Sequence, residues 1–252
     1  LLTSFLGGYP AGAAAVVSLY ERGTISKQSA ERALRFCNNS GPGFFLGVAG
    51  GMVLDSIPAG LALYGIHVLS ALCAGVLLAS RDVPRAALKK LRPQEPPALS
   101  RAFSEAVSGS CAALLQISAL VIFFTAMTAL LQRALPALPA QGLLTGLLEL
   151  TSGITQLKGD WNTRFLCCAF LLGWGGVCVH FQASSLWSAA GLHPRGYWTE
   201  KLLHGLLSLL FAAAFLSKHP AVLALAGVII GFCAIFPFLR KKRGGNPRSV
   251  VV

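Results

Sequence analysis

The sequence is poor in charged residues, and in acidic residues above all. Only 12% of the 252 residues are charged, with 9 Asp and Glu against 21 Lys and Arg. Soluble domains carry about 25% charged residues, and their helices show a polar face to water. This chain is instead 54% hydrophobic, with a mean hydropathy of +0.65. The composition therefore excludes an ordinary soluble domain.

The sequence also lacks the motifs on which many enzymes and metal sites depend. It has no Gly-rich phosphate loop followed by Lys, no G-x-S-x-G and no H-E-x-x-H. Its seven cysteines lie inside apolar stretches, without C-x-x-C or Cys/His ligand spacing. We therefore expect no enzyme, no metal site, no cofactor and no disulfide framework. Cysteines in apolar helices usually behave as small hydrophobic residues.

The chain starts with Leu-Leu-Thr rather than Met. It shows no signal-peptide pattern of a basic start, an apolar core and a small-residue cleavage site. We expect that a further N-terminal part precedes residue 1. Residues 1–6 would then continue an element that begins upstream.

The net charge of +12 comes from basic residues in the short loops between apolar stretches. A nucleic-acid-binding protein gathers such charges on one face of a folded domain, so we exclude nucleic acid as a partner. A helix needs about 20 apolar residues to span a bilayer. We therefore predict an all-α, multi-pass membrane protein whose partner is the lipid bilayer. The stretches without Asp, Glu, Lys or Arg are 36–54, 57–80, 106–132, 165–194 and 219–239.

Two apolar stretches are interrupted in the middle, at 1–20 and at 134–157. We interpret both as re-entrant helical hairpins, the first entering from the cytoplasm and the second from outside. Broken segments at matching places in two halves of a chain are typical of transporters that bind solute at the membrane midplane. The interrupting residues are Gly7, Gly8, Tyr9 and Pro10 in the first hairpin, and Leu150, Thr151, Ser152 and Gly153 in the second.

A broken transmembrane helix and a plain transmembrane helix follow each hairpin. The first broken helix is interrupted at 37–42 and the second at 173–176. This order of elements predicts an inverted repeat. The interrupting glycines and proline are Gly41, Pro42, Gly173, Gly175 and Gly176. The expected organisation is a first repeat at 1–80, a basic linker at 81–101, a second repeat with an additional span at 102–239, and a basic tail at 240–252.

The basic residues predict which side of the membrane each loop faces. If both hairpins are re-entrant, one side holds loops 21–35, 80–101 and 191–201 and the tail. Most Lys and Arg residues, Lys201 among them, then lie on that side. Because cytoplasmic loops carry such an excess, we expect the linker and the tail in the cytoplasm. The opposite side holds Arg133, Lys158, Arg164 and Lys218.

Glu149 is the leading candidate for chemistry, because it is a carboxylate well inside an apolar stretch. Ionisable residues inside a membrane usually mark a functional site. Binding a cation, carrying a proton, or accepting hydrogen bonds from a sugar hydroxyl or a base all fit this residue. The structural alternative is a carboxylate at the mouth of a shallow hairpin, or one paired with Arg164 or Lys158.

Polar side chains next to the breaks are further ligand candidates. Amides and hydroxyls suit a polar, neutral ligand such as a nucleoside. Such groups also cap half-helices or join neighbouring helices, and both interpretations stay open here. The candidates are Asn38, Asn39, Ser40, Thr151, Ser152, His180 and Gln182.

Four strings in these regions are similar to a known family. They are GGYPAGAAAVVSLYERGTIS at 7–26, RFCNNSGPGFFLG at 35–47, LLELTSGI at 147–154 and FLLGWGGVCVHFQ at 170–182. Over essentially its whole length, the chain resembles the YlbJ family of sporulation integral membrane proteins. That family carries the nucleoside recognition, or Gate, domain. The domain is similar to repeats in concentrative nucleoside transporters, spore maturation proteins and the pore part of ferrous iron transporters.

The resemblance implies a multi-pass protein in the inner membrane of a spore-forming bacterium. Two functions fit this origin. The first is a transporter of a small polar solute, coupled to H⁺ or Na⁺ near Glu149. The second is a non-transporting structural component of the sporulating cell's membrane. The domain label does not fix a ligand, because one fold serves many functions. The coupling ion and a homo-oligomeric assembly stay open.

Overall fold

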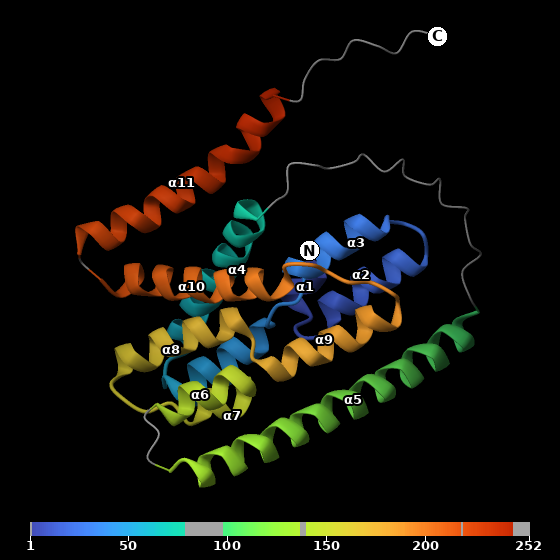
Figure 1. Ribbon diagram of the computed structural model, residues 1–252, viewed down its shortest axis with the longest axis horizontal. Coiled ribbons are helices and arrows are strands. Elements are labelled where there is room, and N and C mark those ends of the chain that lie inside the picture. Colours follow the sequence, from blue (N-terminus) through green and yellow to red (C-terminus); the bar gives the residue numbers. More distant parts are fainter. Residues whose placement is uncertain (1, 79–97, 137–139, 218, 244–252) are drawn as a thin grey trace.

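The computed structural model describes residues 2–78, 98–136, 140–217 and 219–243, and every regular element in these residues is a helix. The all-helical fold class is therefore confirmed. Figure 1 shows a bundle of helices of unequal length, with α5 along one edge and α11 along the opposite edge. In chain order the elements are α1 (Leu2–Leu6), α2 (Ala11–Glu21), α3 (Lys27–Phe36), η1 (Phe44–Val53), α4 (Ile57–Leu77), α5 (Leu99–Ala134), α6 (Gln141–Leu148), α7 (Leu150–Thr155), α8 (Trp161–Trp174), α9 (Val177–Ala189), α10 (Tyr197–Leu216) and α11 (Pro220–Arg243).

The first interrupted stretch folds back on itself, as predicted for a hairpin. Residues 7–10 turn the chain between α1 and α2, and these two helices are in contact. The contact depends on Gly12. A Cβ atom added at Gly12 would lie 3.1 Å from Ser4 Cα and 1.7 Å from the carbonyl oxygen of Cys37. The hairpin therefore packs through its backbone, both on itself and against the first broken helix.

The second hairpin consists of α6 and α7, but its break lies one residue earlier than predicted. Glu149 is extended, with φ −131° and ψ 110°, whereas residues 150–153 form the first turn of α7. The reason is that the Glu149 side chain accepts hydrogen bonds from backbone N–H groups of this turn, as an N-cap does. Gly153 serves packing instead. A Cβ atom there would lie 2.0 Å from Gly146 Cα, so the two arms touch through backbone atoms.

The first broken helix consists of α3, a break at 37–43 and η1. Ser26 caps α3, because its hydroxyl accepts a hydrogen bond from the Ser29 N–H at 3.2 Å. The helix resumes after the break as η1, whose hydrogen bonds follow the wider π-helical pattern. Turns of this kind are rare and occur frequently at functional sites.

The second broken helix consists of α8 and α9, which are separated by Gly175 and Gly176. Both glycines have positive φ, 94° and 80°, and this conformation ends α8 because L side chains rarely adopt it. Gly173, which was predicted to belong to the break, lies inside α8. Its missing side chain lets α10 approach, since a Cβ atom there would lie 2.8 Å from Gly205 Cα.

Four helical regions among the described residues are long and apolar enough to cross a membrane. Three of them are α4, α5 and α10, and the fourth is the broken helix that runs from α8 through α9. α4 and α10 pack against each other, and both also pack against α8. This central group fixes the helices that carry the breaks.

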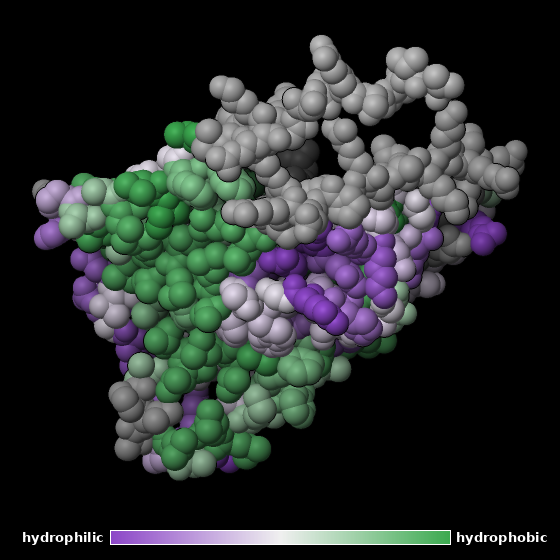
Figure 2. Space-filling view, turned by 45° about the horizontal axis from the view of Figure 1, so that its top comes forward, coloured by the Kyte–Doolittle hydropathy of each residue, from purple (hydrophilic) through white to green (hydrophobic). Residues whose placement is uncertain are grey.

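Helices α5 and α11 expose many large apolar side chains. Figure 2 shows a broad hydrophobic area beside a smaller hydrophilic area on one face of the molecule. Apolar surface of this extent is unusual on a soluble monomer and suits a lipid bilayer. The large apolar residues that α11 exposes are Leu223, Leu225, Val228, Ile230, Phe232 and Ile235.

Two predicted segments lie largely outside the described residues. The linker 81–101 is described only from residue 98, and α5 begins at Leu99. The tail is described only as far as Arg243, and its residues 240–243 continue α11 instead of starting a separate segment. Lys218, predicted for the outer side, also falls outside the described residues.

Candidate functional site at the helix breaks

Three of the four helix breaks border one cavity of about 500 Å³. The tips of both hairpins and the break at 37–43 supply most of its wall, and α5 covers it with Ile117 and Val121. Irregular backbone, rather than the sides of regular helices, therefore forms much of the cavity. The lining residues are Leu6, Gly7, Gly8, Tyr9, Ser40, Gly41, Gly43, Phe44, Ile117, Val121, Glu149, Leu150, Thr151, Val179 and Gln182.

The fourth break, at Gly175 and Gly176, lies against both hairpin tips. A Cβ atom on Gly175 would lie 2.8 Å from the hydroxyl oxygen of Tyr9, in the first tip. A Cβ atom on Gly176 would lie 3.1 Å from the backbone nitrogen of Leu150, in the second tip. The two tips therefore meet at one pair of glycines. Pro10 and Pro42 belong to the breaks but do not line the cavity.

Glu149 lines the cavity while its carboxylate caps α7. The residue is 2% exposed, and its two carboxylate oxygens accept hydrogen bonds from the backbone N–H groups of Thr151 and Ser152, at 3.0 and 2.6 Å. The suggested pairing with Arg164 does not occur, because Arg164 Nη1 donates to the Val53 carbonyl oxygen at 2.7 Å. Of the two neighbours, Thr151 lines the cavity and Ser152 does not.

The two asparagines at the first broken helix bind other parts of the protein. Asn38 Nδ2 donates to the Tyr197 hydroxyl at 3.0 Å. Asn39 Nδ2 donates to the Ser4 hydroxyl at 2.9 Å and to the Phe36 carbonyl oxygen at 2.8 Å. Both asparagines are fully buried and lie behind the cavity. They hold the break in position rather than facing a ligand.

Ser40 and Tyr9 are different, because both residues line the cavity and their buried hydroxyls have no hydrogen-bond partner apart from each other. The two side chains are neighbours. Buried polar groups are nearly always hydrogen-bonded, and an unsatisfied one costs free energy. Among the residues that line the cavity, these two therefore keep unused hydrogen-bonding capacity.

Only one of the two polar candidates on α9 reaches the cavity. Gln182 lines it, and the Gln182 amide also donates to Cys178 Sγ at 3.4 Å. His180 lies behind the cavity, where its Nδ1 is 3.0 Å from the Tyr197 hydroxyl. Its ring packs edge-on against Trp174 and Trp198, with centroid distances of 4.7 and 4.6 Å. His180 therefore joins helices through its ring.

Glu200 and Lys201 were missed by the sequence prediction, which assigned both to the loop 191–201. The structure begins α10 at Tyr197, so the two residues lie in its first turn, 3% and 1% exposed. The Lys201 ammonium donates to the main-chain oxygen of Asn38 and to the Asn39 side chain. The sequence did contain a signal that Lys201 belongs to a helix, because Lys201, His204 and Ser208 have the spacing of residues on one helix face. All three side chains are buried.

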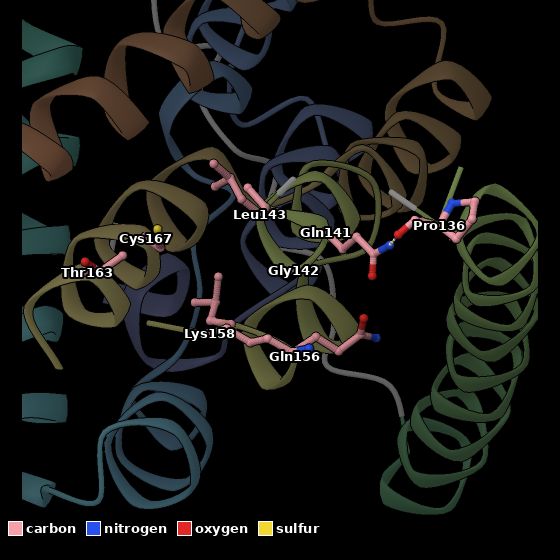
Figure 3. Close-up of a pocket in the computed structure, with 10 residues that line it drawn as sticks. Pro136, Gln141, Gly142, Leu143, Gln156, Lys158, Thr163 and Cys167 are labelled. Carbon is pink, nitrogen blue, oxygen red and sulfur yellow. Dashed lines mark hydrogen bonds between the residues drawn. The ribbon is translucent and has the colours of Figure 1, made fainter. Parts of the chain in front are cut away.

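A second cavity, of about 520 Å³, lies at the open end of the second hairpin (Figure 3). Its polar groups are already engaged in part: Gln141 donates to the Pro136 carbonyl oxygen at 3.0 Å, and Thr163 bonds the Asp160 carboxylate. The Thr163 hydroxyl holds the pKa of Asp160 below its usual value. Lys158 borders this cavity rather than the one at the breaks. The described residues contain no cluster of His, Cys, Asp or Glu that could hold a metal ion.

The comparisons with known proteins agree with the resemblance expected from the motifs. The chain is similar to the sporulation integral membrane protein YlbJ of Bacillus subtilis (strain 168), with 24% identity over 251 residues. The match covers 84% of this chain and 62% of the relative, so the chain spans less than two thirds of that protein's length. No family profile and no solved structure matches the chain.

This similarity confirms the resemblance to the sporulation protein YlbJ that the four strings indicated. The relative is an integral membrane protein by name, and four helical regions of this chain have the length and composition of membrane spans. The chain is therefore an integral membrane protein, similar to one of sporulation.

Proposed function

We propose that the protein transports a small polar solute across the membrane and binds it in the cavity at the helix breaks. The observation that carries the proposal is a pair of cavity-lining residues, Tyr9 and Ser40, whose hydroxyls have no hydrogen-bond partner apart from each other. The Gln182 amide and the Glu149 carboxylate lie in the same wall. A molecule with hydroxyl and amide groups, such as a nucleoside-like solute, could bond to all four side chains.

The breaks themselves support this proposal. Backbone groups inside a bilayer must find partners within the protein, so irregular backbone survives there only inside the protein or beside a wet cavity. Three breaks in this chain border one cavity, and the fourth lies against both hairpin tips. A solute-binding cavity gives this costly arrangement a purpose that helix kinking alone does not.

We infer that the two halves form an inverted repeat similar to those of concentrative nucleoside transporters. Contacts between the halves come in matching pairs: α2 packs on α9 while α7 packs on η1, and α3 packs on α10 while α8 packs on α4. In the first pair of contacts, the second helix of one half's hairpin (α2 or α7) packs on the second segment of the other half's broken helix (α9 or η1). In the second pair, the first segment of one half's broken helix (α3 or α8) packs on the other half's plain helix (α10 or α4). Halves related by a two-fold axis in the membrane plane produce such exchanges.

We place the protein in the inner membrane of a bacterium, with the linker 81–101 and the tail in the cytoplasm. The support is the excess of Lys and Arg in loops on one side. Lys201 no longer counts toward this excess because it is buried in α10. The remaining basic residues of the linker and the tail still favour the same orientation.

A structural role in the sporulating cell's membrane is the alternative. The observation in its favour is that Asn38, Asn39 and Glu149 already bond to the protein's own groups. A scaffold without a ligand would satisfy its polar side chains in this way. The Tyr9 and Ser40 hydroxyls count against the alternative.

The test is thermal stabilisation of the purified protein by a panel of nucleosides and other neutral polar metabolites. A molecule that binds only the folded state raises the melting temperature with its concentration. We expect at least one such solute, and we expect Ser40→Ala and Tyr9→Phe to weaken its effect. The matched controls are Ser188→Ala on α9 and Tyr20→Phe on α2, because neither residue lines the cavity. If no solute shifts the melting temperature, or if the controls weaken the shift equally, the structural alternative stands.

A further inference from the structure

Lys201 is a buried cation that neutral oxygens hold in place of a carboxylate. Its side chain is 1% exposed, and no carboxylate of the described residues forms an ion pair with it, because Glu200 pairs with Arg35. The ammonium donates to the main-chain oxygen of Asn38 and, at 3.3 Å, to Oδ1 of Asn39. Burying a charge is costly unless such partners compensate it.

These oxygens lie at the kind of position where transporters with broken helices bind a cation. α3 ends at Phe36, and the C-terminal end of a helix carries the negative pole of its dipole. Carbonyl oxygens of unwound backbone next to such helix ends coordinate Na⁺ in known transporter folds. In this chain, the Lys201 ammonium takes the same kind of partner at the end of α3.

We propose that Lys201 is a built-in cation that replaces a free monovalent metal ion at the first helix break. The break is then held without Na⁺. This inference rests on the proposed function only for its consequence, which is that solute binding in the cavity requires no Na⁺.

The contacts of the two asparagines carry the effect of this cation to the cavity. Asn38 and Asn39 directly precede Ser40, which lines the cavity. Asn39 also bonds Ser4 in the first hairpin, so Lys201 connects α10 to both the hairpin and the break. The ammonium thereby fixes the position of the Ser40 hydroxyl.

The first experiment compares cations on the unmodified chain. The melting temperature of the purified protein is measured in sodium, potassium and choline chloride at equal ionic strength. We expect the same melting temperature in all three salts, because the protein supplies its own cation. A rise specific to Na⁺ would overturn the proposal without any variant.

The second experiment removes the cation and returns it in solution. Lys201→Ala leaves the two oxygens unpaired beside an empty space, and should lower the melting temperature by roughly 10 °C. Methylammonium has N–H donors and fits the space, so it should restore most of the loss. Tetramethylammonium has no N–H donor and should not. The exposed Lys158 gives the matched control, since Lys158→Ala should respond to neither amine.

Lys201→Met is the second variant, because it fills the space without a charge. We expect a lowered melting temperature that methylammonium does not restore. Equal rescue by both amines, or no rescue of Lys201→Ala, would overturn the proposal. If Lys201→Ala yields no folded protein, the sodium comparison on the unmodified chain decides. All of these experiments measure thermal stability and none measures solute binding. If the protein binds no solute, the transport proposal is wrong, but the proposal for Lys201 is unaffected.

Discussion

Arg35 and Glu200 join α3 to the first turn of α10 through an ion pair with an N–O distance of 2.9 Å. The Glu200 side chain is 4% exposed and that of Arg35 is 19% exposed. Glu200 is therefore the partner that depends more on the pair. Next to it, Lys201 binds the first helix break, so the start of α10 holds both α3 and the break that follows it.

Removing Arg35 should cost more than removing the charge of Glu200. Arg35→Ala leaves a buried carboxylate unpaired, which should lower the free energy of unfolding by about 3 kcal/mol. Glu200→Gln should cost less, because Arg35 reaches solvent and also donates to the Leu78 carbonyl oxygen at 3.4 Å. Unfolding titrations in mild detergent measure the free energy of unfolding of both variants. The double variant should be more stable than the sum of the single losses predicts, and strict additivity would refute the coupling.

Gly176→Ala should destabilise the fold by about 2 kcal/mol. Gly176 has φ 80° and ψ 146°, and a Cβ atom there would also lie 3.1 Å from Leu150 N. Gly227→Ala on α11 is the control, because its φ is ordinary and nothing lies within 4 Å of its added Cβ atom. The control should leave stability unchanged or raise it slightly, since Ala favours a helix more than Gly does. Equal stability of the two variants would refute the role of Gly176.

Replacing Glu149 should separate its capping role from a charge-carrying role. Glu149→Ala leaves two backbone N–H groups of α7 without acceptors and should cost about 2 kcal/mol. Glu149→Gln keeps one acceptor oxygen and should cost clearly less. The exposed Glu21 at the end of α2 provides the control, because Glu21→Ala should have little effect. If Gln costs as much as Ala, the charge rather than the cap stabilises the second hairpin.

Thiol labelling should distinguish the cavity from the lipid-facing surface. Thr151 lines the cavity, whereas Leu115 on α5 is 73% exposed and does not. In membranes, Thr151→Cys should react with a small charged thiol reagent above the level of the parent protein, because the cavity admits water. Leu115→Cys should not react, since charged reagents do not enter the hydrocarbon region. Faster labelling at Leu115 than at Thr151 would contradict the placement of α5 in the lipid bilayer.

Local sequence signals predicted the elements well. The turn residues Gly7 to Pro10 and the glycines at 175 and 176 break their helices because of their own backbone preferences. Apolar length predicted α4, α5 and the broken helix α8–α9 as spans, since crossing a bilayer sets a minimum number of residues. In the described residues, η1 and the apolar part of α11 are shorter than a span, although the stretches 36–54 and 219–239 were predicted to be long enough. The exact break of the second hairpin was missed by one residue, because a side-chain cap on Glu149 moved it.

The candidate site was predicted only in part. Ser40, Glu149, Thr151 and Gln182 do line the cavity, but Asn38, Asn39, Ser152 and His180 do not. Proximity to a break along the chain does not say which way a side chain points once helices pack. Tyr9 was predicted as a tip residue and not as a ligand group, although it lines the cavity.

The amino-acid sequence by itself determined that this is an all-helical membrane protein with four interruptions, because hydropathy and turn chemistry act over a few neighbouring residues. Only the tertiary structure decided that the interruptions gather around one cavity and that Lys201 is buried against Asn38, 163 residues away in the chain. From the sequence, a Lys at the end of an apolar stretch is assigned to a loop. Whether it is instead buried depends on which distant segment of the chain supplies oxygens to its ammonium group, and no local pattern contains this information.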